Sequence, residues 1–134
     1  MRKCVLFIFT VLLSGCFSGL CGYKVQKISS TNNGSKILVK ISKGCGATTV
    51  PTATYYIVSD NIFTNINVEK PKIKKKYKIF SHERGAVKVQ WDANDDINVQ
   101  YDFRTQANGR KGHFLYQTDK VENVNIFYKE SILH

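Results

Sequence analysis

Positions 87–103 read VKVQWDANDDINVQYDF, and this stretch decides the fold class. Apolar and polar residues alternate on both sides of a polar centre, which is the period of a half-buried β-strand. Val87, Val89 and Trp91 are expected to face inward, and residues 93–96 turn the chain. Apolar side chains then alternate back along 97–103. The stretch therefore predicts a β-hairpin.

Upstream of this hairpin, alternation predicts a short strand at 24–28 and a half-buried strand at 36–42. In the second run, Ile37, Val39 and Ile41 would share the buried face. Residues 30–34, Ser-Thr-Asn-Asn-Gly, are typical of a turn. A hairpin is expected here as well.

Further along the chain, β-branched and aromatic residues predict a strand at 52–59. Asp60 and Asn61 would form a tight turn into another strand at 62–68, completing four consecutive antiparallel strands. The lysine-rich segment 69–76 contains Pro71, which prevents regular pairing, and is expected to be an exposed loop.

Downstream of the hairpin, a loop at 107–112 precedes strand-like runs at 113–117 and 124–128. No stretch has a sustained helical period. The sequence therefore predicts an all-β domain with one disulfide, either a small antiparallel sandwich or two packed four-stranded meanders.

The N-terminus has the organisation of a bacterial export signal. Arg2 and Lys3 precede an apolar run at 4–13, which is shorter than a membrane-spanning helix requires. The residues Leu13-Ser14-Gly15-Cys16 resemble the lipobox of bacterial lipoproteins, whose cysteine is acylated and becomes the new N-terminus. Several acyl chains give a stable anchor, whereas one chain alone binds only marginally.

This motif predicts both a domain organisation and a location. The signal peptide would comprise residues 1–15, the lipid-anchor segment residues 16–22, and a single β domain residues 23–134. Palmitate or a similar acyl chain on Cys16 would hold the protein at a membrane of the cell envelope. In a Gram-negative host we expect the outer membrane or a periplasm-facing position. The alternative is a plain signal peptide and a freely secreted protein.

The cysteines fit this scheme. Cys4 lies within the signal and Cys16 would carry lipid, which leaves Cys21 and Cys45 to form a disulfide in an oxidising compartment. Closing a loop of this length contributes about 3.5 kcal/mol on the chain-entropy model. A metal site is the alternative. The spacing of the two cysteines and of the histidines is not that of a zinc site, so neither metal nor cofactor is expected.

The charge of the chain favours anionic partners. Without Arg2 and Lys3, 18 basic residues stand against 10 acidic ones, a net charge of +8. Teichoic acid, lipopolysaccharide and phospholipid head groups are more accessible to an exported protein than nucleic acid. We therefore expect an anionic envelope polymer or lipid head groups as partners, with a protein partner as the alternative and no nucleic acid.

Several motifs occur together in this chain: Leu13–Cys16, Leu20–Gly22, Lys43–Thr49 followed by Thr52 and Thr54, Val87–Trp91, Asp96–Tyr101 and Val121–Tyr128. In this combination they resemble an uncharacterised family of small bacterial lipoproteins and secreted proteins. The resemblance implies an envelope-anchored, β-rich domain with a Cys21–Cys45 disulfide and no assigned activity. The chain departs from the family at 69–78, which is longer and more basic, and at Lys43-Gly44, where the family more often has an acidic residue.

Three groups of side chains are candidate sites. The first is a predicted anion-binding cluster whose alternative is a solvated loop: Lys70, Lys72, Lys74, Lys75, Lys76 and Lys78. The second is a group of hydroxyls that could face a glycan or an anion, or could be present for β-propensity: Thr48, Thr49, Thr52 and Thr54. The third could supply a catalytic pair: His82, Glu83, Arg84 and His113 with Asp92, Asp95, Asp96 and Asp102.

No nucleophile motif or phosphate-binding loop accompanies these residues, so we expect the protein not to be an enzyme. A hydrolase would require His82 or His113 beside a carboxylate in a cleft. The expected function is a non-enzymatic binding or structural role at the membrane surface. The alternative is an inhibitor or immunity-type protein that blocks a secreted enzyme such as a lysozyme. An inhibitor needs a protruding rigid loop, whereas a surface binder needs a broad basic face.

Overall fold

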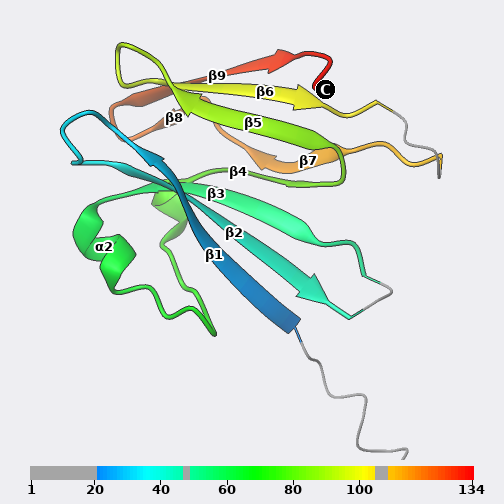
Figure 1. Ribbon diagram of the computed structural model, residues 1–134, viewed down its shortest axis with the longest axis horizontal. Helices are drawn as coiled ribbons and strands as arrows, with labels where there is room; N and C mark the ends of the chain where they lie inside the picture. The colour runs from blue at the N-terminus through cyan, green and yellow to red at the C-terminus, as the bar shows by residue number, and fades with distance from the viewer. Residues whose placement is uncertain (1–20, 47–48, 105–108) are drawn as a thin grey trace, which may run out of the picture.

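The computed structural model describes residues 21–46, 49–104 and 109–134, which form two stacked β-sheets (Figure 1). Within these ranges nine strands, one short α-helix and one 3-10 turn are present. The predicted all-β sandwich is confirmed. The two sheets have five and four strands, and one strand of the first sheet, β4, immediately precedes the hairpin of residues 87–103.

The five-stranded sheet, called the large sheet below, has the strand order β1-β2-β3-β4-β7 and is antiparallel throughout. Its strands are β1 (Cys21–Ser30), β2 (Ile37–Cys45), β3 (Thr52–Val58), β4 (Lys78–Glu83) and β7 (His113–Gln117). The edge strands are β1 and β7.

The four-stranded sheet, called the small sheet, has the order β5-β6-β9-β8. Its strands are β5 (Ala86–Trp91), β6 (Ile97–Asp102), β8 (Lys120–Val121) and β9 (Val124–Glu130). β6 and β9 are parallel, so the chain must cross over between them. It does so through β7 in the large sheet, and the strands therefore alternate between the sheets rather than forming two consecutive meanders.

The predicted hairpin at 87–103 is present as β5 and β6. Val89 pairs with Val99, and Trp91 pairs with Ile97. The Asp92 carboxylate closes the turn by accepting hydrogen bonds from the backbone N–H groups of Asn94 (2.8 Å) and Asp96 (3.0 Å). An aspartate at the start of a turn commonly makes these bonds, which is why the polar centre of this stretch turns the chain.

The main core lies between the sheets and is aliphatic and aromatic. Phe80 is its largest fully buried side chain, stacked on Tyr55 with ring centroids 4.5 Å apart and edge-on to Phe114 at 5.5 Å. The other buried members are Leu38, Ile57, Ile79, Val89, Ile97, Val99, Val121, Val124 and Ile126. Both sheets supply them, so the two sheets share one core.

The predicted strand at 62–68 is wrong. Asp60–Thr64 forms helix α2, whose first turn is capped by the Ser59 hydroxyl, which accepts from the backbone N–H of Ile62. Ile62, Phe63 and Ile66 pack together on a second buried cluster. Their spacing places them on one side of a helical turn, whereas in a strand they would point to both faces.

This second cluster lies on the outer face of the large sheet, the face turned away from the small sheet. It contains Ile37, Val39 and Ile41 of β2 together with Val58 of β3. The predicted shared face of the three β2 residues is therefore confirmed by their packing. Leu38, between them, enters the main core instead. The large sheet is thus covered on both faces in its middle.

Candidate functional site

Five of the six predicted anion-binding lysines lie on a segment that crosses the outer face of the large sheet. We call this segment, residues 65–77, the basic strap. It runs from the end of α2 to the start of β4 and contains a single short turn, η1 (Lys75–Tyr77). Ile66, Ile73 and Tyr77 pack into the second cluster and hold the strap on the sheet. The predicted loop is confirmed, and its apolar residues keep it close to the strands.

The lysines of the strap face solvent while its apolar residues face the sheet. The five strap lysines are exposed, and Lys78, the first residue of β4, is half-buried. The ion pairs between described residues include Arg84 with Glu83, Arg104 with Asp102 and His113 with Glu83, and no lysine takes part in them. Within the described ranges, none of the six lysines therefore has a carboxylate at salt-bridge distance.

The structure brings Lys70 and Lys72 together with the beginning of the large sheet. These two lysines line a hollow of about 390 Å³ whose other walls include Cys21 and Tyr23 of β1. In Figure 1 the loop after α2 extends toward the same end of the molecule as the start of β1. Lys43 is also at this end, with Nζ 5.8 Å from the centre of the Tyr23 ring.

Lys75 and Lys78 form a separate group. Their Nζ atoms lie 5.7 Å and 4.6 Å from the centre of the Tyr116 ring in β7. The pKa of Lys78 is lowered, first by burial and then by the charge of Lys75. Two cations that share one aromatic ring without a carboxylate favour an added anion. The cluster predicted as one site is thus divided between two places on the same outer face.

The charged residues are unevenly distributed between the first part of the domain, residues 21–85, and the second part, residues 86–134. Residues 21–85, which form β1 to β4, α2 and the strap, contain 12 Lys and Arg against three Asp and Glu. Residues 86–134 contain six Lys and Arg against seven Asp and Glu. Residues 86–134 also include β7 of the large sheet, which contains no Lys, Arg, Asp or Glu. The basic excess therefore belongs to β1 to β4 and the strap, and the rest of the domain is close to neutral.

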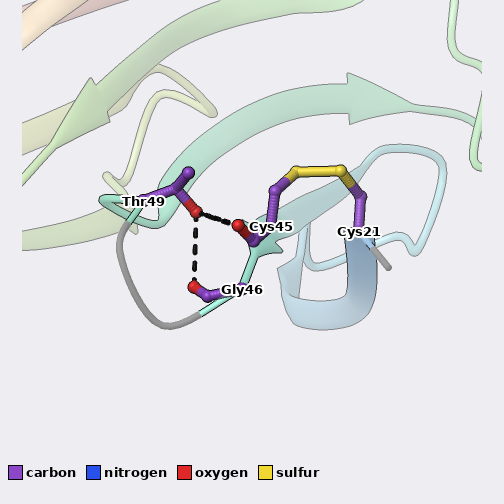
Figure 2. Close-up of a disulfide and its surroundings, with 4 residues drawn as sticks. All are labelled: Cys21, Cys45, Gly46 and Thr49. Atoms are coloured by element: carbon purple, nitrogen blue, oxygen red, sulfur yellow. Dashed lines mark hydrogen bonds between the residues drawn. A yellow bond between two sulfur atoms is a disulfide. The ribbon is translucent and has the colours of Figure 1, made fainter. Parts of the chain in front are cut away.

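The predicted disulfide between Cys21 and Cys45 is present (Figure 2). The two cysteines are direct cross-strand partners at the end of the β1–β2 pair. The Thr49 hydroxyl donates to the carbonyls of Cys45 and Gly46, which folds the chain back after the bond. This hydroxyl is therefore used by the turn itself, which supports a structural role for the motif. Thr48 lies outside the described residues.

His82 is a core residue, which the sequence did not predict. It is 8% exposed and its ring stacks on Phe103 at 5.9 Å and on Tyr55 at 6.1 Å. Nδ1 donates to the carbonyl of Arg84 (3.1 Å), because a carbonyl can only accept. Nε2 is buried without a hydrogen-bond partner among the described residues. Burial, followed by the charge of Lys40, lowers the pKa of this imidazole, while the Arg84 carbonyl opposes the shift.

The other residues considered for a catalytic pair have structural contacts. His113 is exposed, with Nε2 3.9 Å from a carboxylate oxygen of Glu83. Asp102 accepts from the Arg104 side chain at 2.8 Å and 2.7 Å and from the backbone N–H of Leu133 at 3.2 Å. The hydrogen bonds from Arg104 are the main reason that the pKa of Asp102 is far below its usual range. Asp96 accepts from the backbone N–H of Asn125 at 2.8 Å.

The predicted signal peptide and Cys16 lie outside the described residues. Within the described ranges, no helix has the length and apolarity needed to cross a bilayer, and no three His, Cys, Asp or Glu side chains are grouped as metal ligands. Comparison of the chain with protein-family models, with curated proteins and with solved structures gives no match. The site therefore has to be interpreted from its own geometry.

Proposed function

We propose that this protein is an exported, membrane-anchored lipoprotein whose β domain binds the anionic surface of the membrane that holds it. One observation carries the proposal: Lys70 and Lys72 line the same hollow as Cys21, the first residue of β1. Cys21 follows the lipobox cysteine Cys16 by five residues, a length of chain that spans at most about 18 Å. The basic strap and the anchor would therefore meet the membrane together.

The energetics of membrane binding support this combination. A lysine near an anionic bilayer contributes about 1 kcal/mol, and a basic patch is the usual second signal beside a lipid chain. In the described part of the chain no strap lysine has a carboxylate at salt-bridge distance. Glu69 also lines the hollow, but Lys70 and Lys72 outnumber it there, so a net positive charge is available to an external anion. The function proposed is binding, with no chemical step.

The same geometry favours a surface binder over the inhibitor alternative. The basic residues are spread over the outer face of the large sheet, from Lys43 and Lys70 at one end to Lys75 and Lys78 at Tyr116. A planar anionic partner could contact both groups at once. An inhibitor that blocks the cleft of an enzyme would instead need one protruding loop to enter that cleft.

Vesicle binding tests the proposal. The exported chain would be prepared with Cys16→Ser, so that it cannot be acylated, and sedimented with phosphatidylcholine vesicles with or without phosphatidylglycerol. Replacing Lys70, Lys72 and Lys74 by Gln should weaken binding to the anionic vesicles by about 10- to 100-fold at low salt. The unsubstituted domain should bind less tightly as salt is added.

The matched control removes the same charge from the small sheet. Lys88, Lys120 and Lys129 are exposed residues of β5, β8 and β9, and their replacement by Gln also lowers the net charge by three. This variant should keep its vesicle affinity within about threefold, because charges more than a Debye length from the bilayer are screened. Equal losses in the two variants would contradict a binding face on the strap. Mass spectrometry of the wild-type N-terminus would separately test the acylation of Cys16.

A further inference from the structure

The tip of the basic strap, residues 67–72, presents an apolar side chain to solvent in a fixed turn. The Asn67 carboxamide oxygen accepts hydrogen bonds from the backbone N–H groups of Glu69 (2.9 Å) and Lys70 (3.2 Å). Val68 lies within this turn and is 62% exposed. The Asn67 side chain closes this turn and so keeps Val68 directed to solvent. Exposing an apolar side chain to water costs free energy, and nothing in the turn itself requires an apolar residue at this position.

The neighbours of Val68 show that burial was available. Ile66, two residues earlier, and Ile73, five residues later, both pack into the second cluster on the large sheet. Val68 does not join them, and the strap rises from the sheet between these two contacts. The residues after it are Glu69, Lys70, Pro71 and Lys72, of which both lysines are exposed. An apolar side chain beside cations suits the boundary between acyl chains and head groups.

Other exposed apolar side chains lack this setting. Phe127 of β9 is 54% exposed, but it lines a hollow with Asp119 on the near-neutral part of the domain. Leu115 of β7 is 49% exposed and its neighbours in sequence are Phe114 and Tyr116. Tyr23 of β1 is 36% exposed and lines the hollow with Lys70 and Lys72. Val68 lies two residues before Lys70 in the strap and is the most exposed of these apolar side chains, at 62%.

We propose that the strap tip inserts into the head-group region of an anionic phospholipid bilayer. Val68 would enter the acyl boundary, Lys70 and Lys72 would contact lipid phosphates, and the hollow beside Tyr23 would receive a head group. This inference rests on the proposed function and adds to it the depth and orientation of the domain. The chain enters the domain at Cys21, in the wall of this hollow, so a membrane that holds residue 16 is closest to this end of the large sheet.

The depth of the tip is measurable by tryptophan fluorescence. Val68→Trp and, as its matched control, Phe127→Trp would each be made in the Cys16→Ser chain, with Trp91 present in both as a common background. On addition of phosphatidylcholine–phosphatidylglycerol vesicles, we expect a blue shift and quenching by bromine-labelled acyl chains for Val68→Trp only. Both positions are exposed, so thermal unfolding should match that of the parent chain.

A second variant tests the energetic contribution of the tip. Val68→Ser should weaken binding to the same vesicles by about three- to tenfold and leave the salt dependence unchanged, because it removes apolar burial and no charge. If the chain binds these vesicles but Val68→Trp shows neither shift nor quenching, the tip contact is wrong and the proposed function stands. If no form of the chain binds anionic vesicles, both are wrong.

Discussion

The large sheet and the small sheet share one core but differ in what covers their outer faces and in the charge of their parts of the chain. The large sheet is covered on its outer face by α2 and the strap, and its part of the chain, residues 21–85, has a net charge of +9. The small sheet leaves polar side chains such as Gln90 and Asn125 on its outer face, and residues 86–134 have a net charge of −1. One half therefore carries the charge that is available for binding.

This difference shows which part of the basic composition the fold requires. The outer layer of the large sheet is held by apolar contacts from Ile62, Phe63, Ile66, Ile73 and Tyr77. The lysines between them make no ion pair in the described structure and repel one another. Because no ion pair within the described residues accounts for these lysines, their number on one face supports the proposed binding of an anionic membrane surface.

The disulfide provides the strongest test of the difference between the two sheets, because both of its cysteines belong to the large sheet. Replacing Cys21 and Cys45 by Ala should lower the free energy of unfolding by about 3.5 kcal/mol, since the unfolded chain gains the freedom of the opened loop. Urea unfolding of the oxidised chain and of this variant measures the loss.

Hydrogen exchange would show where that loss is expressed. Amides of β1 and β2 should exchange faster in the variant, while those of β6 and β9 should change only through global unfolding. Equal acceleration of local exchange in both sheets would mean that the bond stabilises the sandwich as a whole, and the two sheets would then not be separable units.

The sequence predicted the small sheet better than the surroundings of the large one. Residues 87–103 have a two-residue period on both sides of a turn closed by Asp92, and this local information suffices for a hairpin. The pairing of β7 with β4 across about thirty residues has no such local cause. Helix α2 has five residues, too few for a helical period to be visible, although Ser59 is a typical N-cap.

The candidate site shows the same limit. The lysines were predicted to form one cluster because they are close in sequence. The sequence could not show that the strap crosses the sheet and separates Lys70 and Lys72 from Lys75 and Lys78. The burial of His82 was within reach, because it is two residues after Phe80 on the same strand and so shares its face. The Cys21–Cys45 bond was predicted from the count of cysteines together with the predicted export signal, and the structure contains it.

His82 allows the shared core to be tested by pH. Its folded pKa is below the ordinary value of 6.5, so the unfolded chain takes up a proton first as the pH falls. The stability that depends on neutral His82 is complete above about pH 6.5 and is lost below it, with a slope of at most about 1.4 kcal/mol per pH unit. Lys40 adds positive charge near the ring, the Arg84 carbonyl accepts from Nδ1, and Tyr55 stacks on the ring.

Urea unfolding between pH 7.5 and pH 5 would measure this slope. His82→Phe should flatten it, because the aromatic cluster is kept and the titrating group is removed. His113→Gln is the control, since that histidine is exposed and its replacement should leave the slope in place. If the slope disappeared with His113→Gln and persisted with His82→Phe, the pH dependence would come from His113, and the prediction for His82 would be wrong.

The smallest expected effect distinguishes the two lysine groups within the large sheet. The pKa of Lys78 is lowered partly by Lys75, so Lys75→Gln should raise it toward its ordinary value, although burial keeps it below. Lys70→Gln, at the other end of the strap, should not change it, because charges that far apart are screened. NMR titration of the Lys78 side chain measures both variants. If Lys70→Gln changed the Lys78 pKa as much as Lys75→Gln does, the two lysine groups would be electrostatically coupled along the whole strap, and the predicted separation would be wrong. If only Lys75→Gln changed the Lys78 pKa, the outer face would have two electrostatically separate groups of lysines for binding anions.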